Sequence, residues 1–213
     1  TLLLSYGALL AAPFIAVFLL LSFWKNSTEN YYSEIMKNDL TEGRMAFEKQ
    51  LDIMCAGAFS VSNDSDLKWV YFLDGLKDGD NNIAALIRCN DMLRQTFADS
   101  EHYQNYSVIM KNELIFRKSG MVVGDKFFYD NYCTYQNTDF ETWRKQSFES
   151  NTWQLFPLEE IDTGERTFQA MTFSYPVRNY IQQEPEANAV VQFLLSKENL
   201  EQMFGQLLSR QGG

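Results

Sequence analysis

Apolar residues fill the first 24 positions of the chain, and charged residues enter only after them. No side chain from Thr1 to Trp24 is charged, and Lys25 opens a polar, acidic region. At a rise of about 1.5 Å per residue, a helix of this length reaches roughly 36 Å, enough for a hydrocarbon core of roughly 30 Å. We therefore expect residues 1–24 to form a transmembrane helix. The alternative is a cleaved secretory signal, which normally has a shorter apolar region, of about 7–15 residues, behind a basic start.

A helical repeat continues beyond this run. Along residues 26–60, apolar side chains recur at steps of three, four and seven, which places them on one face of a long helix. The polar run from Ser62 to Asp66 ends that pattern. A second amphipathic helix is predicted over residues 82–98, because Ile83, Leu86, Ile87, Leu93 and Phe97 share a face.

The pattern changes to β-type alternation after Tyr103. Short strands are predicted near residues 106–111, 114–124, 153–158, 167–177 and 187–195. The turns between them are short, whereas parallel neighbours need crossovers of about a dozen residues or more. We therefore predict an antiparallel sheet within residues 106–195. A capping box at Thr138–Glu141 predicts a short helix through Phe148, and Ser196 is expected to cap an exit helix over residues 197–208.

These elements make the predicted fold class α+β, with residues 25–213 as one domain behind the apolar helix. The formal net charge of −10 argues against DNA, RNA or an anionic membrane surface as partners of this segment. No nucleic-acid contact is therefore expected.

Metal and cofactor sites are not predicted. Asp78, Asp80 and Asn82 have the spacing of the first ligands of a calcium-binding EF-hand loop, but isoleucine and cysteine occupy the positions that require glycine and glutamate. A helix cap explains this cluster better. His102 is the single histidine and no Cys-x-x-Cys pair occurs, which makes zinc improbable.

The three cysteines, Cys55, Cys89 and Cys133, are odd in number and cannot all pair within the chain. They are interpreted as buried free thiols, with one disulfide as the alternative if the domain lies outside the cell. The sequence also lacks a Gly-rich phosphate loop and a nucleophile elbow, and one histidine gives a catalytic triad little support. We therefore do not expect an enzyme.

Aromatic residues gather in the segment Phe127–Cys133 and shortly after it. Aromatic walls with a few polar tips are the usual lining of a small-ligand pocket, although the same rings could simply join the sheet to its helices. Arginine suits an anion anchor because its planar donors grip a carboxylate or phosphate in bidentate fashion; a surface salt bridge is the alternative. The candidate ligand-binding residues are the walls Tyr129, Tyr132, Trp143 and Tyr175 and the anchors Arg144 and Arg178.

The layout resembles the Cache superfamily of bacterial extracytoplasmic sensors. The apolar start LLLSYGALLAAPFIAVFLLL, the stretch FYDNYCTYQNTDFETW and the segments TFQAMTFSYPVRN and ANAVVQFLLSKENLEQMF are similar to the input regions of membrane-anchored AraC-type transcription regulators of Gram-positive bacteria. This resemblance implies a PAS-like antiparallel sheet and an extracytoplasmic sensor region at the cell membrane. It also implies a small-molecule ligand and a DNA-binding part outside this segment, and we expect a homodimer in the full receptor.

One feature departs from that family. The arginine–tryptophan–tyrosine signature of amino-acid-binding double-Cache domains is absent, and only Trp143-Arg144 is similar to part of it. The alternatives are an envelope interaction or structural domain that binds a protein or polysaccharide, the input domain of a histidine kinase, and a tethered enzyme without a recognisable motif. An enclosed pocket between sheet and helix favours a sensor, and a flat apolar patch favours a protein partner.

Overall fold

The computed structural model describes residues 2–70, 79–97, 103, 105–178 and 187–204. The chain divides into two compact units, Thr1–Ala46 with Phe204–Gly213, and Phe47–Met203. The sheet and the candidate site both lie in the second unit.

Helix α1 (Leu2–Ser62) is one continuous helix of 61 residues. Residues 26–60 lie within it, as predicted. Across the part of the chain whose placement is described, no helix is both long and apolar enough to cross a membrane. The prediction of a transmembrane helix over residues 1–24 is therefore wrong. That prediction counts the length of the uncharged run alone, whereas the run is only the beginning of an element that continues through polar sequence.

Two shorter helices follow in the second unit. Helix α2 (Ser65–Val70) begins where Asp64 accepts a hydrogen bond from the Leu67 amide at 2.9 Å. Helix α3 (Gly79–Thr96) corresponds to the helix predicted over residues 82–98, whose last residue lies outside the described part of the chain. Of the apolar face predicted for this helix, Leu86, Leu93 and Phe97 are buried in the core, together with Cys89. Ile83 and Ile87, which the spacing predicts on the same face, are more than half exposed.

The sheet is antiparallel throughout, which confirms the α+β prediction. Its spatial order is β3-β2-β1-β7-β6-β5-β4. The strands are β1 (Asn105–Met110), β2 (Leu114–Arg117), β3 (Gly120–Val123), β4 (Thr134–Tyr135), β5 (Gln154–Asp162), β6 (Thr167–Val177) and β7 (Ala189–Ser196). The predicted strand over residues 114–124 is a hairpin of two strands, because the chain reverses at Gly120, whose φ is 140°.

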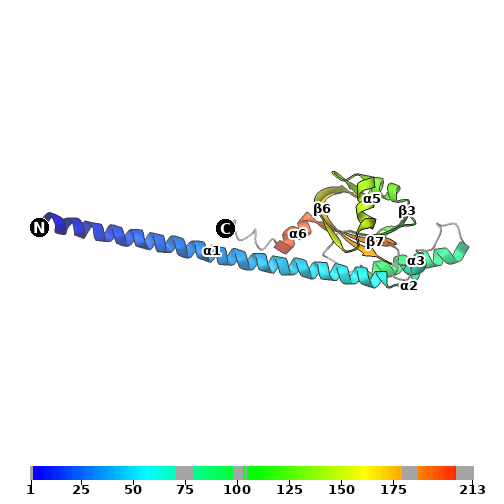
Figure 1. Ribbon diagram of the computed structural model, residues 1–213, viewed down its shortest axis with the longest axis horizontal. Helices are drawn as coiled ribbons and strands as arrows, with labels where there is room; N and C mark the ends of the chain where they lie inside the picture. Colours follow the sequence, from blue (N-terminus) through cyan, green and yellow to red (C-terminus); the bar gives the residue numbers. More distant parts are fainter. Residues whose placement is uncertain (1, 71–78, 98–102, 104, 179–186, 205–213) are drawn as a thin grey trace. The chain divides into compact units, whose positions relative to one another are not determined.

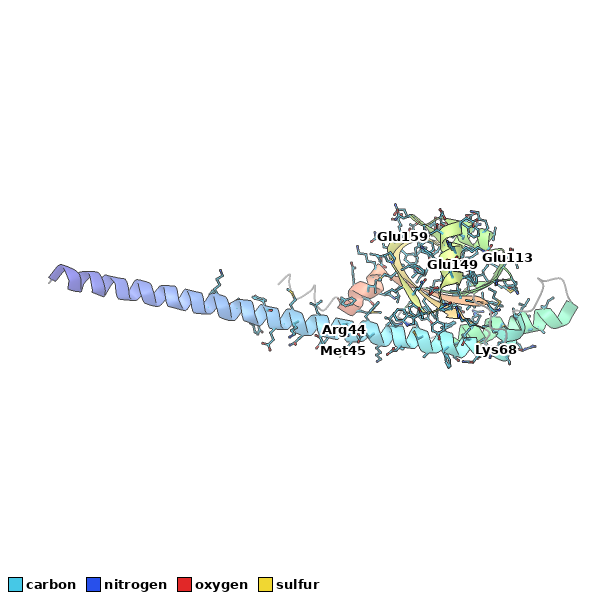
Figure 2. The ribbon with its side chains drawn as sticks, viewed as in Figure 1. Arg44, Met45, Lys68, Glu113, Glu149 and Glu159 are labelled. Carbon is cyan, nitrogen blue, oxygen red and sulfur yellow. The ribbon has the colours of Figure 1, made fainter. Side chains whose placement is uncertain are left out.

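Each face of the sheet is covered by helices, with a separate apolar core on each side (Figures 1 and 2). Residues of α1, α2 and α3 pack on one face, against side chains such as Phe116, Phe173 and Phe193. Helices α4 (Asp125–Tyr132) and α5 (Phe140–Glu149) pack on the other, which we call the α5 face. Successive side chains of a β-strand point to opposite faces of the sheet, which explains why the strands contribute to two separate cores.

The helices of the α5 face differ in how well the sequence predicts them. The capping box predicted at Thr138–Glu141 locates α5 correctly, although the N-cap is Asp139 and not the first residue of that box. Asp139 accepts a hydrogen bond from the Thr142 amide at 2.7 Å. The sequence pattern predicts neither α4 nor the two-residue strand β4. The last helix, α6 (Lys197–Phe204), starts where predicted, and the expected residues 205–208 lie outside the described part.

Candidate functional site

A row of polar side chains crosses the middle of the α5 face. Ser107 of β1 pairs with Gln192 of β7, and Gln192 pairs with Ser174 of β6. Directly paired residues point to the same face of a sheet, so the three side chains form one row. All three are buried, and each lies in an otherwise mainly apolar or aromatic strand. Burying such groups costs free energy unless they are hydrogen-bonded, which makes the row a place to look for a ligand.

Strand β5 carries a β-bulge beside this row. Phe156 pairs with Thr172 and Glu159 pairs with Ala170, so three steps along β5 match two steps along β6. The extra residue brings both Phe156 and Glu159 to the α5 face, although residues three apart in a regular strand point to opposite faces. Pro157 fits within the bulge because it has no amide hydrogen to donate to a ladder.

A partly enclosed cavity of about 130 Å³ lies between this bulge, β7 and helix α5. We call it the α5 pocket. At roughly 30 Å³ per molecule of water, its volume equals that of about four waters. Its lining combines aromatic walls with amide, hydroxyl and carboxylate groups: Tyr135, Thr138, Trp143, Gln146, Ser147, Phe156, Pro157, Glu159 and Gln192.

Two buried polar atoms of the lining have no hydrogen-bond partner among the described residues. They are the indole Nε1 of Trp143 and the amide oxygen Oε1 of Gln192. Trp143 is 3% exposed and Gln192 is 2% exposed. One atom is a donor and the other an acceptor, and an unsatisfied buried group of this kind costs about 1–3 kcal/mol. Both residues line the α5 pocket, and a bound molecule that reaches these two atoms would satisfy a donor and an acceptor together.

Other polar groups of the pocket lining form hydrogen bonds within the protein. Gln192 donates through Nε2 to the Ser147 hydroxyl at 2.9 Å, and that hydroxyl donates to the Trp143 carbonyl at 2.7 Å. The Tyr135 hydroxyl shares a hydrogen bond with Thr172 at 2.9 Å. Burial raises the pKa of Tyr135 well above its usual range, so this phenol stays neutral.

Glu159 is the one charged side chain in the lining of the α5 pocket. It accepts hydrogen bonds from the Asn137 amide and, at 3.1 Å, from the Thr138 hydroxyl. These contacts fix its position at the rim but leave lone pairs of the carboxylate available. The electrostatic character of the pocket is therefore anionic.

Four of the predicted site residues lie on α4 and α5. Trp143 lines the pocket, and the Tyr129 ring lies 5.4 Å from the Trp143 ring. Tyr129 is buried and donates to the Thr138 carbonyl. Tyr132 stacks instead under the Arg117 guanidinium, 3.9 Å from its ring centre. Arg144 forms an ion pair with Asp125, so the structure gives this arginine the salt-bridge role considered as its alternative.

The other two predicted residues lie on or after β6. Tyr175 packs with the core on the opposite face of the sheet from α5, since its neighbours Phe173 and Val177 belong to that core. Arg178 is half-buried directly after the end of β6. Neither residue lines the α5 pocket.

Gln192, Glu159 and Ser147 are pocket residues that sequence reasoning missed. The sequence holds a usable signal for Gln192, which is the single polar residue inside the apolar run Ala189–Leu195. A polar residue within a strand buried on both sides needs a partner or a ligand. Glu159 had no such signal, because only the bulge turns it toward the pocket.

Metal and disulfide chemistry find no support at the site. Among the described residues, no three histidine, cysteine, aspartate or glutamate side chains are grouped to hold a metal ion. The three cysteines are free thiols, and Cys89 and Cys133 are buried.

Comparison with known proteins yields a structural similarity only. No family model and no curated protein matches the chain. Among solved structures, the chain is similar to the periplasmic sensory domain of the Campylobacter jejuni chemoreceptor Tlp1, with a TM-score of 0.46 and 13% sequence identity. The similarity covers 84% of this chain and 63% of the Tlp1 sensory domain, so this chain spans less than two thirds of the length of that domain.

Proposed function

We propose that this chain is a sensor region that binds a small polar molecule in the α5 pocket. The observation that carries this proposal is a partly enclosed cavity lined by both Trp143 and Gln192, whose buried donor Nε1 and buried acceptor Oε1 have no partner among the described residues. Native proteins rarely leave buried polar atoms unsatisfied, and a ligand that satisfies both gains affinity from each.

The lining also defines the chemistry of the ligand. An acceptor oxygen would receive the Trp143 indole hydrogen, while donor hydrogens would serve Gln192 and the Glu159 carboxylate. A cavity of about 130 Å³ admits only a compact molecule. Small primary amines and amides that also carry a hydroxyl or carbonyl oxygen meet these requirements. Simple carboxylates do not, because no cation lines the α5 pocket.

The pocket is connected directly to a segment that can transmit a signal. Gln192 lies on β7, which passes into α6 without a loop, and Ser196 accepts from the Asn199 amide at 3.2 Å at this junction. A ligand shifts a conformational equilibrium only through its different affinities for two states. In our proposal, a ligand that engages Gln192 favours one position of β7 and so changes the stability of the first turn of α6.

The wider context of this sensor is proposed from the sequence resemblance. In that setting the domain is extracytoplasmic and belongs to a larger signalling receptor, which functions as a homodimer. The output is a transcription regulator whose DNA-binding part lies outside this segment. The acidic chain described above would then sense the ligand and make no nucleic-acid contact of its own.

The test is a thermal-shift and calorimetric screen of the 213-residue chain against ethanolamine, glycinamide, acetamide and acetate. We expect at least one of the first three to bind, and acetate to fail. Trp143→Phe keeps an aromatic ring but removes the indole donor, and should weaken binding by about tenfold. Trp153→Phe is the matched control, since Trp153 is 48% exposed and stacks on Phe173 away from the pocket.

Hydrogen exchange provides the second readout. A bound ligand should slow amide exchange in the first turn of α6. The proposal fails if none of the probes binds, which would mean that ordered waters alone occupy the cavity. It also fails if Trp143→Phe and Trp153→Phe weaken the binding of a probe equally. Binding without any change of exchange in α6 would leave a ligand site but refute the proposed signal path.

A further inference from the structure

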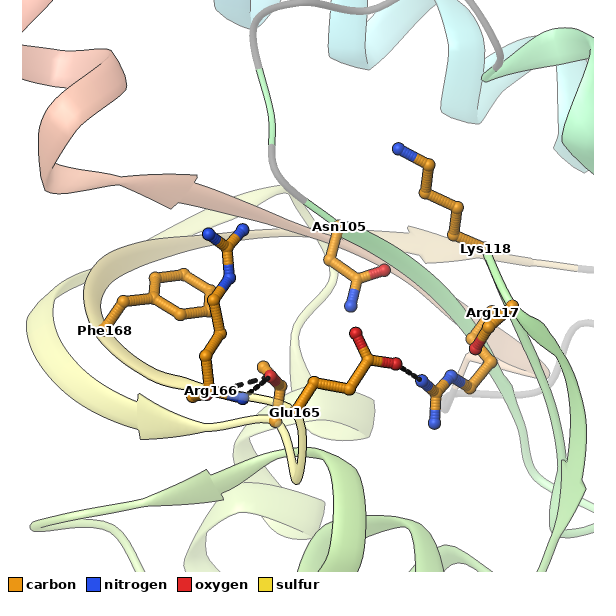
Figure 3. A pocket seen from close by; sticks show the side chains of 8 residues that line it. Asn105, Arg117, Lys118, Glu165, Arg166 and Phe168 are labelled. Carbon is orange, nitrogen blue, oxygen red and sulfur yellow. Dashed lines mark hydrogen bonds and ion pairs between the residues drawn. The ribbon is translucent and has the colours of Figure 1, made fainter.

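A second cavity on the same unit has the opposite electrostatic character. It is an open cleft of about 400 Å³, lined by Asn105, Arg117, Lys118, Ser119, Thr163, Glu165, Arg166 and Phe168 (Figure 3). We call it the basic cleft. Three cationic side chains face one carboxylate in its lining, which gives a local charge of +2 on a chain whose formal net charge is −10. Such a local concentration of positive charge needs an explanation.

Arg117 is the central residue of the basic cleft. Its side chain is only 9% exposed, and its guanidinium lies 3.9 Å from the centre of the Tyr132 ring. Within the residues that the structure describes, its one polar contact is with Glu165, at 3.5 Å, and the Glu165 side chain is 76% exposed. A guanidinium has five donor hydrogens, so a single long contact leaves most of them without a protein partner. Buried arginine normally has much closer bidentate partners.

Unlike Arg117, the two other cations of the cleft have no carboxylate partner among the described residues. Lys118 and Arg166 are exposed, and neither forms an ion pair in this part of the chain. Arg166 lies over the Phe168 ring at 4.9 Å, so Phe168 supplies an apolar wall beside its charge. Figure 3 shows the Glu165 carboxylate extending toward Arg117 from the turn between β5 and β6.

We propose that the basic cleft binds a small organic oxyanion, a carboxylate or a phosphate, through Arg117, Lys118 and Arg166. The buried guanidinium of Arg117 grips two oxygens of the anion, and the exposed cations add charge at the entrance. Glu165 occupies the Arg117 donors in the empty cleft and is displaced when the anion binds. The Phe168 ring provides a surface for an apolar body attached to the anionic group.

This site is separate from the α5 pocket in both residues and chemistry. The two linings share no residue, and the α5 pocket carries a carboxylate where the basic cleft carries three cations. Within the sheet they are connected because Arg117 pairs with Ser107 and Ser107 pairs with Gln192. A failed screen at one site therefore does not bear on the other.

The test titrates the 213-residue chain with inorganic phosphate and, separately, with benzoate, at constant ionic strength maintained with sodium chloride. The readout is the set of arginine side-chain N–H resonances in an NMR spectrum, which identifies the arginine that contacts the probe. We expect saturable shifts centred on Arg117 and Arg166, with Arg144 unmoved because it is paired with Asp125. A preference for phosphate or for benzoate decides which oxyanion class the cleft takes.

Three substitutions of exposed residues test the proposal without disturbing the fold. Lys118→Gln and Arg166→Gln should each weaken binding several-fold, while Glu165→Gln should strengthen it by removing the competing carboxylate. Lys145→Gln, on the exposed face of α5, is the control for a general change of charge. The proposal is overturned if neither probe shows saturable binding, if Lys145→Gln weakens binding as much as the cleft variants, or if Glu165→Gln leaves the affinity unchanged or lower.

Discussion

Phe156 and Glu159 point to the same face of the sheet although they are three positions apart along β5. The bulge between Phe156 and Glu159 makes this happen, as their partners Thr172 and Ala170 on β6 are two residues apart. A bulge that turns a side chain toward a cavity is a common device beside functional sites. Here it places an apolar wall and a carboxylate together in the α5 pocket.

The first prediction concerns that carboxylate. Asn137 and Thr138 donate to different oxygens of Glu159, so Glu159→Gln keeps an acceptor oxygen for the Asn137 amide and places an amide donor opposite the Thr138 hydroxyl, which can accept from it; the negative charge is removed. We expect a loss of stability of about 1 kcal/mol or less and a much larger loss of affinity for a cationic amine than for a neutral amide. Urea denaturation and calorimetry with ethanolamine and acetamide measure the two effects. Equal losses for both probes would mean that Glu159 contributes no charge to binding.

The second prediction concerns Gln192, whose Oε1 is buried without a partner. Gln192→Met keeps a similar volume and removes both the unsatisfied acceptor and the contact with Ser147. We expect the stability of the empty protein to stay within about 1 kcal/mol of the native value, or to rise, while ligand binding is lost. Chemical denaturation of the ligand-free variant measures this. A loss of several kcal/mol would show that Gln192 has a structural role only.

The third prediction is a pH dependence at the start of α5. Hydrogen bonds from Thr142 hold the pKa of the Asp139 carboxyl below its usual range. A lowered pKa in the folded state means that the stabilisation is present above the unfolded pKa, near 3.9, and is lost as the pH falls through the folded value. Asp139→Asn preserves an N-cap without this titration. Melting temperatures measured between pH 6 and pH 3 should fall more steeply for the native protein than for the variant; parallel curves would contradict the assignment.

The fourth prediction concerns thiol reactivity. Burial raises the pKa of Cys89 and of Cys133 to about 12, and burial also raises the pKa of the half-buried Cys55. The thiolate is the reactive form, so the folded protein should react slowly with a thiol reagent at pH 8, and first at Cys55. Mass spectrometry after timed labelling identifies the order. Rapid labelling of Cys133 without denaturant would contradict its burial.

The fifth prediction concerns Gly164, in the turn between β5 and β6. Its φ is 75°, and a Cβ at this position would collide with the Asn131 carbonyl oxygen. We expect Gly164→Ala to destabilise the protein by more than ~1 kcal/mol, through both strain and collision. Gly164→Asn separates the two causes, since asparagine tolerates positive φ but still carries a Cβ. If Gly164→Asn is as stable as the native protein in urea denaturation, the collision has no effect.

The sequence pattern alone determined most of the elements of the second unit. The helical spacing over residues 26–60 and 82–98 and the β-type alternation after Tyr103 locate elements that the structure contains. These patterns work because burial of one face imposes a period of 3.6 on a helix and 2 on a strand. The same reasoning fails over residues 1–24, where the length of an uncharged run does not establish that a helix crosses a membrane.

Only the tertiary structure decided which side chains share a site. Trp143 was identifiable from its aromatic surroundings, but Tyr175 lies with the core on the other face and Arg144 is paired with Asp125. Gln192 and Glu159 reach one pocket through strand register and a bulge, and Arg117 and Arg166 reach one cleft from different hairpins. Local sequence specifies the period of an element, whereas register depends on pairings between strands far apart in the chain. A shift of one residue in such a pairing reverses the face to which each side chain points.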